Sequence, residues 1–341
     1  MTASASPAAG DAAAAAAAPL LEVENLHTAF PTQHGAVLAA AGVSFSLAER
    51  ETKGIVGESG SGKSITLRSL LGLVPEPGRV IEGSVRWAGR DLLSLRPAEL
   101  RAIRGREISL IFQDPTSSLN PVYTIGEQIA ETLRIKLGMP ARAARERAVE
   151  LLDHVGIPAA KSRLGAYPHE LSGGMRQRVM IAIAIACKPR LLLADEPTTA
   201  LDVTIQDQIL ALLAELQDEF GMAMILVSHD LGVVAQNCDS VAVMYAGHVV
   251  EDAPARELFE SPRHPYTAAL LEALPSIRSP GTRGRLRQIS GQPPDLFRLP
   301  AGCPFGPRCT LARDACVDVT MEPVEVGRLH TTACPFTAEA R

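Results

Sequence analysis

No stretch of this sequence is apolar enough to cross a lipid bilayer, which takes roughly 18–20 consecutive apolar residues. The longest candidate, residues 179–187, is far shorter and leads into Lys188 and Pro189. The sequence also lacks a strong excess of one charge, since 33 Lys and Arg against 38 Asp and Glu leave a net charge of −5. A mildly acidic chain is poorly suited to wholesale nucleic-acid binding, so we expect no nucleic-acid partner. These absences predict a soluble chain.

A secretory signal is absent as well. The alanine run at residues 12–18 has no Lys or Arg before it and Asp11 at its edge, whereas a signal peptide needs a basic segment followed by a more apolar one. We expect residues 1–19 to form a disordered tail and the chain to be cytoplasmic. Cysteine is sparse, and six in 341 residues cannot make a secreted disulfide scaffold. In a cytoplasmic chain, the four cysteines between residues 303 and 334 favour a metal site over disulfides.

The hydrophobic pattern predicts an α/β fold. Hydrophobic residues make up 46% of the chain and charged residues 21%, which excludes disorder of the whole chain. Short apolar runs at 54–57, 191–194 and 224–228 are typical of parallel strands that are buried on both faces. They alternate with stretches that we expect to be helical, at 64–73, 126–137, 141–155, 174–186 and 204–220.

Two parts of the chain depart from this alternation. Residues 115–170 show helical patterns and no convincing buried strand, which indicates a helical insertion. After about residue 260, many prolines interrupt a segment with little periodicity, and we place a domain boundary there. The expected organisation is a main domain at 20–260, with a helical part at about 115–175, followed by a C-terminal extension at 261–341.

A glycine-rich segment predicts a phosphate-binding loop. It fits the pattern G-x-x-x-x-G-K-[ST] between a strand and a helix, and reads Gly57-Glu58-Ser59-Gly60-Ser61-Gly62-Lys63-Ser64. The glycines let backbone N–H groups close around phosphate oxygens, and the helix N-terminus adds its positive dipole. We expect Lys63 to reach the β- and γ-phosphates and the Ser64 hydroxyl to bind Mg²⁺.

Two further strands end in groups suited to hydrolysis. Asp195 and Glu196 follow the run 191–194, and the carboxyl ends of such strands are where ligands bind in an open α/β sheet. Asp195 suits Mg²⁺ binding through water, and Glu196 suits a general base for the attacking water. His229 closes the strand at 224–228 and could bond the γ-phosphate, although a structural histidine there is an equal alternative.

A second anion-binding helix start lies far along the chain. Ser172 is a good N-cap, and Gly173 and Gly174 expose backbone N–H groups. One triphosphate cannot use both this turn and the Lys63 loop. A dimer, in which each chain offers this turn to the nucleotide of the other, resolves the conflict.

Together, these motifs closely resemble the ATP-binding cassette (ABC) family, whose motif order matches residues 20 to about 255. The resemblance implies a P-loop NTPase fold with a RecA-like core, an antiparallel β subdomain and a helical subdomain. It also implies a head-to-tail dimer around two ATP molecules. In that dimer, Gln113 would touch Mg²⁺ and the permease, Asp202 would link the two active sites, and His229 would act as the switch histidine. Phe30 would stack on adenine.

Three longer segments narrow the resemblance to the oligopeptide/dipeptide importer ATPases: 112–121, 194–204 and 261–267. This implies an ATPase at the cytoplasmic face of the cell membrane, with two permease subunits, a second ATPase chain and an extracytoplasmic solute-binding protein. The alternatives are a soluble ABC ATPase that acts on ribosomes or DNA, and the same importer architecture with nickel or another non-peptide cargo. Lys53 departs from the family pattern at a strand entrance, where its side chain could reach solvent. We expect this departure to affect stability or loop shape more than catalysis.

The extension carries a cluster of cysteines with the spacing C-x5-C-x6-C-x17-C, formed by Cys303, Cys309, Cys316 and Cys334. Four thiolates on a short, proline-rich segment can replace a hydrophobic core with metal bonds. The spacing itself does not decide between zinc and an iron–sulfur cluster. The resemblance to the importer ATPases, whose C-terminal extension holds a [4Fe–4S] cluster, favours iron–sulfur, with zinc or free thiols as alternatives.

Overall fold

The computed structural model describes residues 18–33, 35–199, 201–273 and 289–337. The expected tail at 1–19 therefore lies almost wholly outside the described residues, as does part of the extension. Within the described ranges, no helix is long and apolar enough to cross a membrane.

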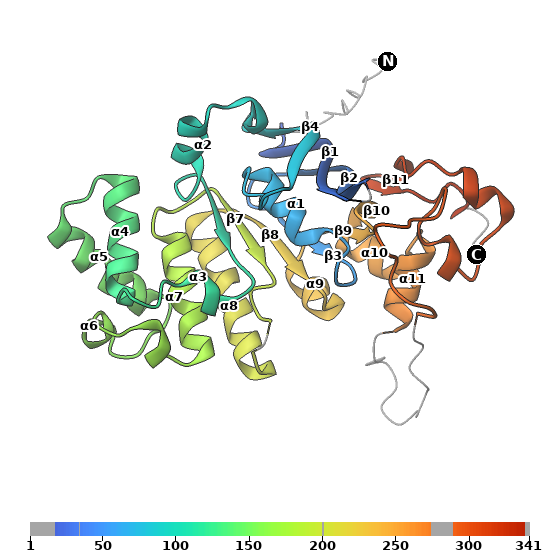
Figure 1. Ribbon diagram of the computed structural model, residues 1–341. Coiled ribbons are helices and arrows are strands. Elements are labelled where there is room, and N and C mark those ends of the chain that lie inside the picture. The colour runs from blue at the N-terminus through green and yellow to red at the C-terminus, as the bar shows by residue number, and fades with distance from the viewer. Residues whose placement is uncertain (1–17, 34, 200, 274–288, 338–341) are drawn as a thin grey trace, which may run out of the picture.

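Two sheets organise the molecule (Figure 1). The smaller sheet is antiparallel and has the order β2-β1-β4-β5, with β1 (Leu21–Thr32), β2 (Gly35–Leu47), β4 (Arg79–Trp87) and β5 (Arg90–Asp91). The larger sheet has the order β11-β12-β10-β9-β3-β8-β7-β6. Its parallel strands are β3 (Thr52–Val56), β6 (Ile108–Ile111), β7 (Leu191–Asp195), β8 (Ala223–Ser228) and β9 (Ser240–Tyr245). Its antiparallel strands are β10 (His248–Pro254), β11 (Val324–Gly327) and β12 (His330–Thr332).

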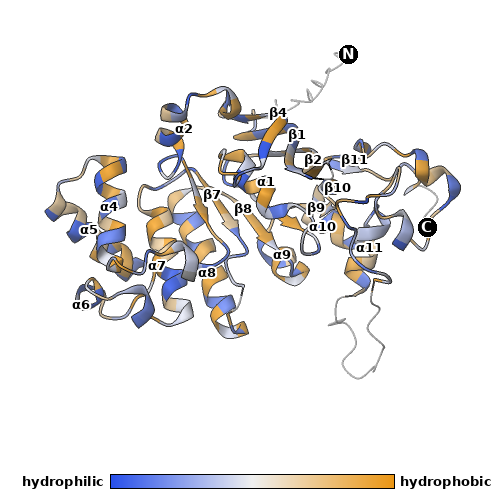
Figure 2. Cartoon of the chain, in the orientation of Figure 1, coloured by the Kyte–Doolittle hydropathy of each residue, from blue (hydrophilic) through white to orange (hydrophobic). Residues whose placement is uncertain are grey.

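The parallel strands lie where their apolar runs predict them. Every residue of β3, β7 and β8 is buried, because helices cover both faces of a parallel sheet. Figure 2 shows β7 and β8 as predominantly hydrophobic. The predicted strands at 54–57, 191–194 and 224–228 are therefore confirmed. Their carboxyl ends meet at one edge of the sheet, which brings residues 57, 195 and 229 into one region.

The helical prediction over 115–170 is also confirmed. This stretch forms α3 (Pro115–Ser118), α4 (Ile125–Leu137), α5 (Ala141–His154), α6 (Ala160–Arg163) and the 3-10 turn η2 (Pro168–Glu170). The other helices described before residue 274 are η1 (Leu92–Ser94), α1 (Lys63–Leu70), α2 (Pro97–Ile103), α7 (Gly173–Ile185), α8 (Val203–Phe220), α9 (Leu231–Asn237), α10 (Ala255–Glu260) and α11 (Pro265–Glu272). Leu133 of α4 and Leu151 of α5 share one core with Leu192 of β7, so the helical part packs continuously with the sheet.

The described C-terminal residues join the main sheet. β12 pairs with β10, with Glu251 opposite Thr332, and two 3-10 turns, η3 (Gly306–Arg308) and η4 (Asp314–Asp318), precede it. Phe305 packs at 5.3 Å from the ring centroids of both Tyr245 and Tyr266. The cysteine-bearing segment thus packs against the end of β9 and against α11.

One suggestion from the sequence about this sheet is wrong. Lys53 does not extend to solvent, because its side chain is only 4% exposed and its Nζ lies 2.7 Å from Asp252 Oδ1. The carboxylate of Asp252 on β10 gives the ammonium a buried partner, which solvent would otherwise have to supply.

Candidate active site

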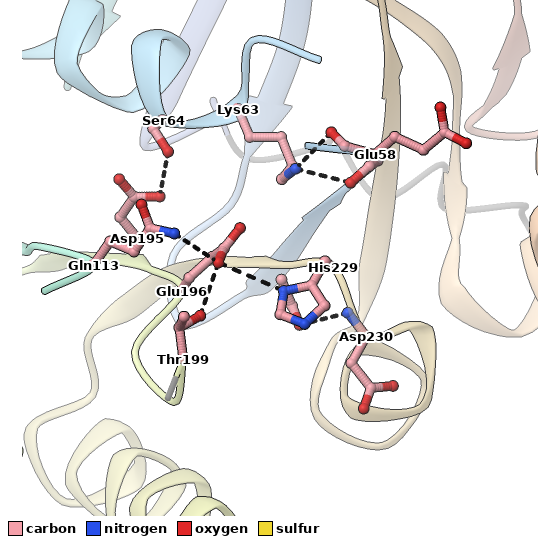
Figure 3. Close-up of polar contacts among 11 residues, drawn as sticks. Glu58, Lys63, Ser64, Gln113, Asp195, Glu196, Thr199, His229 and Asp230 are labelled. Atoms are coloured by element: carbon pink, nitrogen blue, oxygen red, sulfur yellow. Dashed lines mark hydrogen bonds and ion pairs between the residues drawn. The ribbon is translucent and has the colours of Figure 1, made fainter. Parts of the chain in front are cut away.

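The phosphate loop lies between β3 and α1. Gly62 caps α1 with φ of +103°, and a Cβ there would lie 2.1 Å from the backbone oxygen of Ala39. Only glycine fits this position. Lys63 Nζ donates to the backbone oxygens of Gly57 at 2.8 Å and Glu58 at 3.0 Å, so its ammonium lies over the loop (Figure 3).

Lys63 also lies in a field of carboxylates. Its burial lowers the pKa of Lys63 below the ordinary value, whereas the charges of Glu196, Asp195 and Glu58 act to raise it. An additional anion such as phosphate can approach a cation that already feels three carboxylate charges only if other positive groups assist. The N-terminus of α1 and the backbone N–H groups of the loop provide that assistance.

A hydroxyl and a carboxylate meet at the entrance of α1. Ser64 Oγ donates to Asp195 Oδ1 at 2.8 Å, which connects the phosphate loop to the end of β7. Asp195 is 1% exposed, and this burial raises its pKa, partly offset by the Ser64 hydrogen bond. A serine hydroxyl and a desolvated carboxylate are oxygen ligands of the kind that Mg²⁺ binds, so this pair fits the ion.

Three side chains converge on the carboxylate of Glu196 (Figure 3). Its Oε2 accepts hydrogen bonds from Gln113 Nε2 at 2.9 Å and Thr199 Oγ1 at 2.8 Å. His229 Nδ1 lies 3.5 Å from the same oxygen. Gln113 follows β6, Glu196 follows β7 and His229 follows β8, so three neighbouring parallel strands deliver them. The sequence did not identify Thr199, although it lies only three residues after Glu196.

Glu196 itself has a strained backbone. Its φ is +46°, in the left-handed region that side chains other than glycine rarely adopt. Its side chain is 11% exposed, and it faces a cavity of about 150 Å³. The lining residues are Glu196, Thr198, Thr199, Leu201, Gln206, Ser228, His229 and Asp230. A water molecule in this cavity would lie beside a fixed carboxylate, as general-base catalysis requires.

The second anion-binding turn is formed but lies elsewhere. Ser172 is exposed and caps α7, with Oγ accepting from the backbone N–H of Met175 at 3.3 Å. Figure 1 shows α7 among the helices of the 115–185 region, apart from α1. A Cβ on Gly174 would lie 2.8 Å from Ile205, which places the turn against the start of α8. Asp202 caps that helix by accepting from Ile205 N at 3.0 Å. The structure therefore does not join the two anion sites within one chain.

Phe30 lies on β1, opposite Val37 of β2. Its ring packs against Gly78, where a Cβ would approach within 2.4 Å. Val37 lines a cavity of about 280 Å³ that also includes residues 58–61 of the phosphate loop. The half-buried Phe30 ring thus lies beside β2, the strand whose Val37 borders this cavity.

The four cysteines line one mostly apolar cavity of about 90 Å³. Burial raises the pKa of Cys303, Cys309 and Cys334 above that of an ordinary thiol. Backbone N–H groups of residues 305, 306, 311 and 336 face these sulfurs and favour the thiolate. Among the residues described, no group of three or more His, Cys, Asp or Glu side chains is arranged to hold a single metal ion.

Comparison with known proteins identifies the family. The ABC transporter family matches residues 40–199, and the family described as oligopeptide/dipeptide transporter, C-terminal region, matches residues 250–316. A putative peptide import ATP-binding protein of Brucella abortus is 54% identical over 88% of this chain and 90% of its own length. The chain belongs to the ABC transporter family.

Other similarities support the membership. This ABC protein is 51% identical to the oligopeptide transport ATP-binding protein OppD of Salmonella typhimurium, over 93% of this chain and 94% of OppD. Among solved structures, the dimeric ATP-binding cassette MJ0796 bound to ADP and Pi matches with a TM-score of 0.63 and 30% identity. That match covers 69% of this chain and 99% of MJ0796. The P-loop ATPase fold with an antiparallel sheet and helices is therefore confirmed, and ATP with Mg²⁺ is the ligand pair that the family implies.

Proposed function

We propose that this chain is the ATP-hydrolysing subunit of an ABC importer for peptides. The observation that carries the ATPase assignment is the convergence of Gln113, Thr199 and His229 on Glu196 beside the phosphate loop. The cargo is proposed because relatives at 51–54% identity over most of the chain are named for peptide import or oligopeptide transport. Nickel or other non-peptide cargo is not favoured by those names.

The site residues divide the chemistry between them. The loop 57–64 binds the triphosphate through its N–H groups, and Lys63 shifts from the loop carbonyls to the β- and γ-phosphates. Ser64 and Asp195, with Gln113, would hold Mg²⁺, which neutralises charge on those phosphates. Glu196 orients the attacking water and accepts its proton, and His229 donates to the γ-phosphate. Phe30 stacks on adenine.

The complete site requires two chains. Ser172, Gly173 and Gly174 of one chain would face the γ-phosphate that is bound to the loop of the other, with Asp202 between the two sites. This arrangement is supported by the exposed Ser172 turn, which lies apart from its own phosphate loop. The second chain is another ABC ATPase, identical or different. ATP binding closes the dimer, and hydrolysis reopens it.

The family relationship suggests where the ATPase works. Two transmembrane permease subunits would receive the motion at the cytoplasmic face of the membrane, and an extracytoplasmic solute-binding protein would deliver the peptide. We further propose that residues 20–260 form the nucleotide-binding domain, with its helical part at about 115–175, and that 261–341 form the extension.

The extension would hold a [4Fe–4S] cluster on Cys303, Cys309, Cys316 and Cys334. The residues fit such a group because all four thiols line one mostly apolar cavity and backbone N–H groups face three of the sulfurs. A single zinc ion is less well supported, since it needs the four thiolates to converge at about 2.3 Å from one point. The cluster would act as a structural brace rather than as an electron carrier.

Two measurements test the proposal. Glu196→Gln should lower ATP turnover by at least 100-fold, because the amide cannot accept the proton, while ATP binding and ATP-dependent dimerisation remain. Ordinary phosphate release by that variant would rule out Glu196 as the base.

For the cargo, purification of the tagged chain from solubilised native membranes should recover multi-span permeases. Recovery with ribosomal or DNA-repair proteins instead would contradict the transport role.

A further inference from the structure

The C-terminal segment reaches the phosphate loop through one arginine. Arg308 forms two parallel hydrogen bonds with the Glu58 carboxylate, Nη1 to Oε2 at 2.7 Å and Nη2 to Oε1 at 2.9 Å. The two residues are 250 positions apart, and their side chains are 7% and 23% exposed. A shielded, two-pronged pair of this kind fixes both position and orientation.

The other contacts of Arg308 and Glu58 make the pair rigid. Arg308 Nε donates to the backbone oxygen of Ser290 at 3.0 Å, and its guanidinium lies over the ring of Tyr245, 5.9 Å from the centroid. The backbone N–H of Glu58 donates to the hydroxyl of Tyr266 at 3.0 Å. Both the side chain and the backbone of Glu58 are therefore held by residues outside the loop.

Glu58 is an unfavourable residue for a loop that binds a polyanion. Its carboxylate lies one residue after Gly57, in the loop that wraps the phosphates, and would repel them. Its charge already acts on Lys63, although Figure 3 shows the Glu58 side chain directed away from that ammonium. Arg308 is the cation that pairs with this carboxylate, and it comes from the extension rather than from the main domain.

We propose that Arg308 is a positioning residue for ATP, because its cation neutralises the Glu58 carboxylate that would otherwise repel the phosphates. The inference rests on the proposed function, since it requires that the loop binds ATP. It adds that nucleotide affinity depends on a residue of the cysteine-bearing extension, within the turn between Cys303 and Cys309. Arg308 touches the loop and not the reacting atoms.

A charge-pair experiment separates this role from simple bracing. The affinity for a fluorescent ATP analogue is measured by titration for the full chain, Arg308→Met, Glu58→Gln and the double variant. Arg308→Met should weaken binding about tenfold, roughly the effect of one hydrogen-bonded charge. The double variant should return to within about twofold of the original chain, because no unpaired carboxylate remains. Arg298→Met, at an exposed arginine of the same segment, is the matched control and should bind normally.

Each outcome decides the proposal. Unchanged affinity in Arg308→Met would overturn it, and so would a double variant that binds as weakly as Arg308→Met, because a purely structural brace is not rescued by removing its partner. If Arg308→Met fails to fold, Glu58→Gln alone is decisive. It should bind the analogue more tightly, since the Arg308 cation remains, and weaker binding would refute the electrostatic role. Failure of the unmodified chain to bind the analogue would instead overturn the proposed function, and this inference with it.

Discussion

Lys53 and Asp252 form an ion pair across the main sheet, with Nζ and Oδ1 2.7 Å apart. Lys53 lies on β3 and Asp252 on β10, and β9 lies between them. Burial raises the pKa of Asp252, whereas the charge of Lys53 lowers it. The pair thus ties β10 to β3, the strand that leads into the phosphate loop.

Removing one member of this pair should destabilise the fold strongly. Lys53→Met leaves the largely buried Asp252 carboxylate, whose side chain is 20% exposed, without its cation. We expect the free energy of unfolding in urea to fall by about 3 kcal/mol. Replacing both residues, Lys53→Met with Asp252→Leu, should recover most of that loss, because no unpaired charge remains. A loss below about 1 kcal/mol in the single variant would show that solvent replaces the Lys53 cation as the partner of Asp252.

Thr199 should be required for fast turnover, although it was not identified from the sequence. Thr199→Val removes one of the hydrogen bonds that fix Glu196, and we expect kcat for ATP to fall about tenfold or more with ATP affinity unchanged. Thr198→Val is the matched control, since Thr198 lines the same cavity, whereas it is the Thr199 hydroxyl that donates to Glu196. Equal effects of the two changes would argue against a specific role for the Thr199 hydroxyl.

Acid should weaken the fold through His248. Burial and the nearby His27 lower the pKa of His248 to about 4, from the ordinary value of 6.5. Between pH 6.5 and 4, the His248 imidazole is therefore protonated in the unfolded chain but neutral in the folded chain. The contribution of neutral His248 to the free energy of unfolding is fully present above pH 6.5. As the pH decreases through that window, the free energy of unfolding should fall by up to about 1.4 kcal/mol per pH unit. Urea unfolding of His248→Gln should show a flatter pH dependence, whereas His169→Gln, at an exposed site, should behave like the original chain.

Metal content tests the cysteine site directly. Anaerobically purified protein should be brown and hold about four iron atoms per chain. Cys309→Ser should lose most of that iron, and Cys187→Ser should keep it, because Cys187 is not among the residues that line the cavity. A colourless protein with one zinc ion per chain would contradict the iron–sulfur assignment and favour a zinc site on these cysteines.

The sequence predicts those parts of the fold that are determined within one short segment of the chain. The loop at Lys63 and Ser64, the acids after β7 and the apolar runs of β3, β7 and β8 all belong to this class. The antiparallel sheet of β1, β2 and β4 as a whole was expected only from the family resemblance, because its partly exposed strands and register shifts blur the alternating pattern. Contacts that join distant positions, such as Arg308 with Glu58, leave no local pattern at all.

The pairing of β12 with β10 has a consequence for shortened chains. β12 covers the outer edge of β10, and His330 Nε2 contacts the fully buried carboxylate of Glu251 at 2.8 Å. A chain cut after residue 260 would leave the outer edge of β10 unpaired where it now meets β12, at Glu251 and Asp252, and open one side of Glu251 to water. Unpaired strand edges recruit strands from other molecules. The isolated cassette should therefore self-associate, and the extension protects the solubility of the domain that it follows.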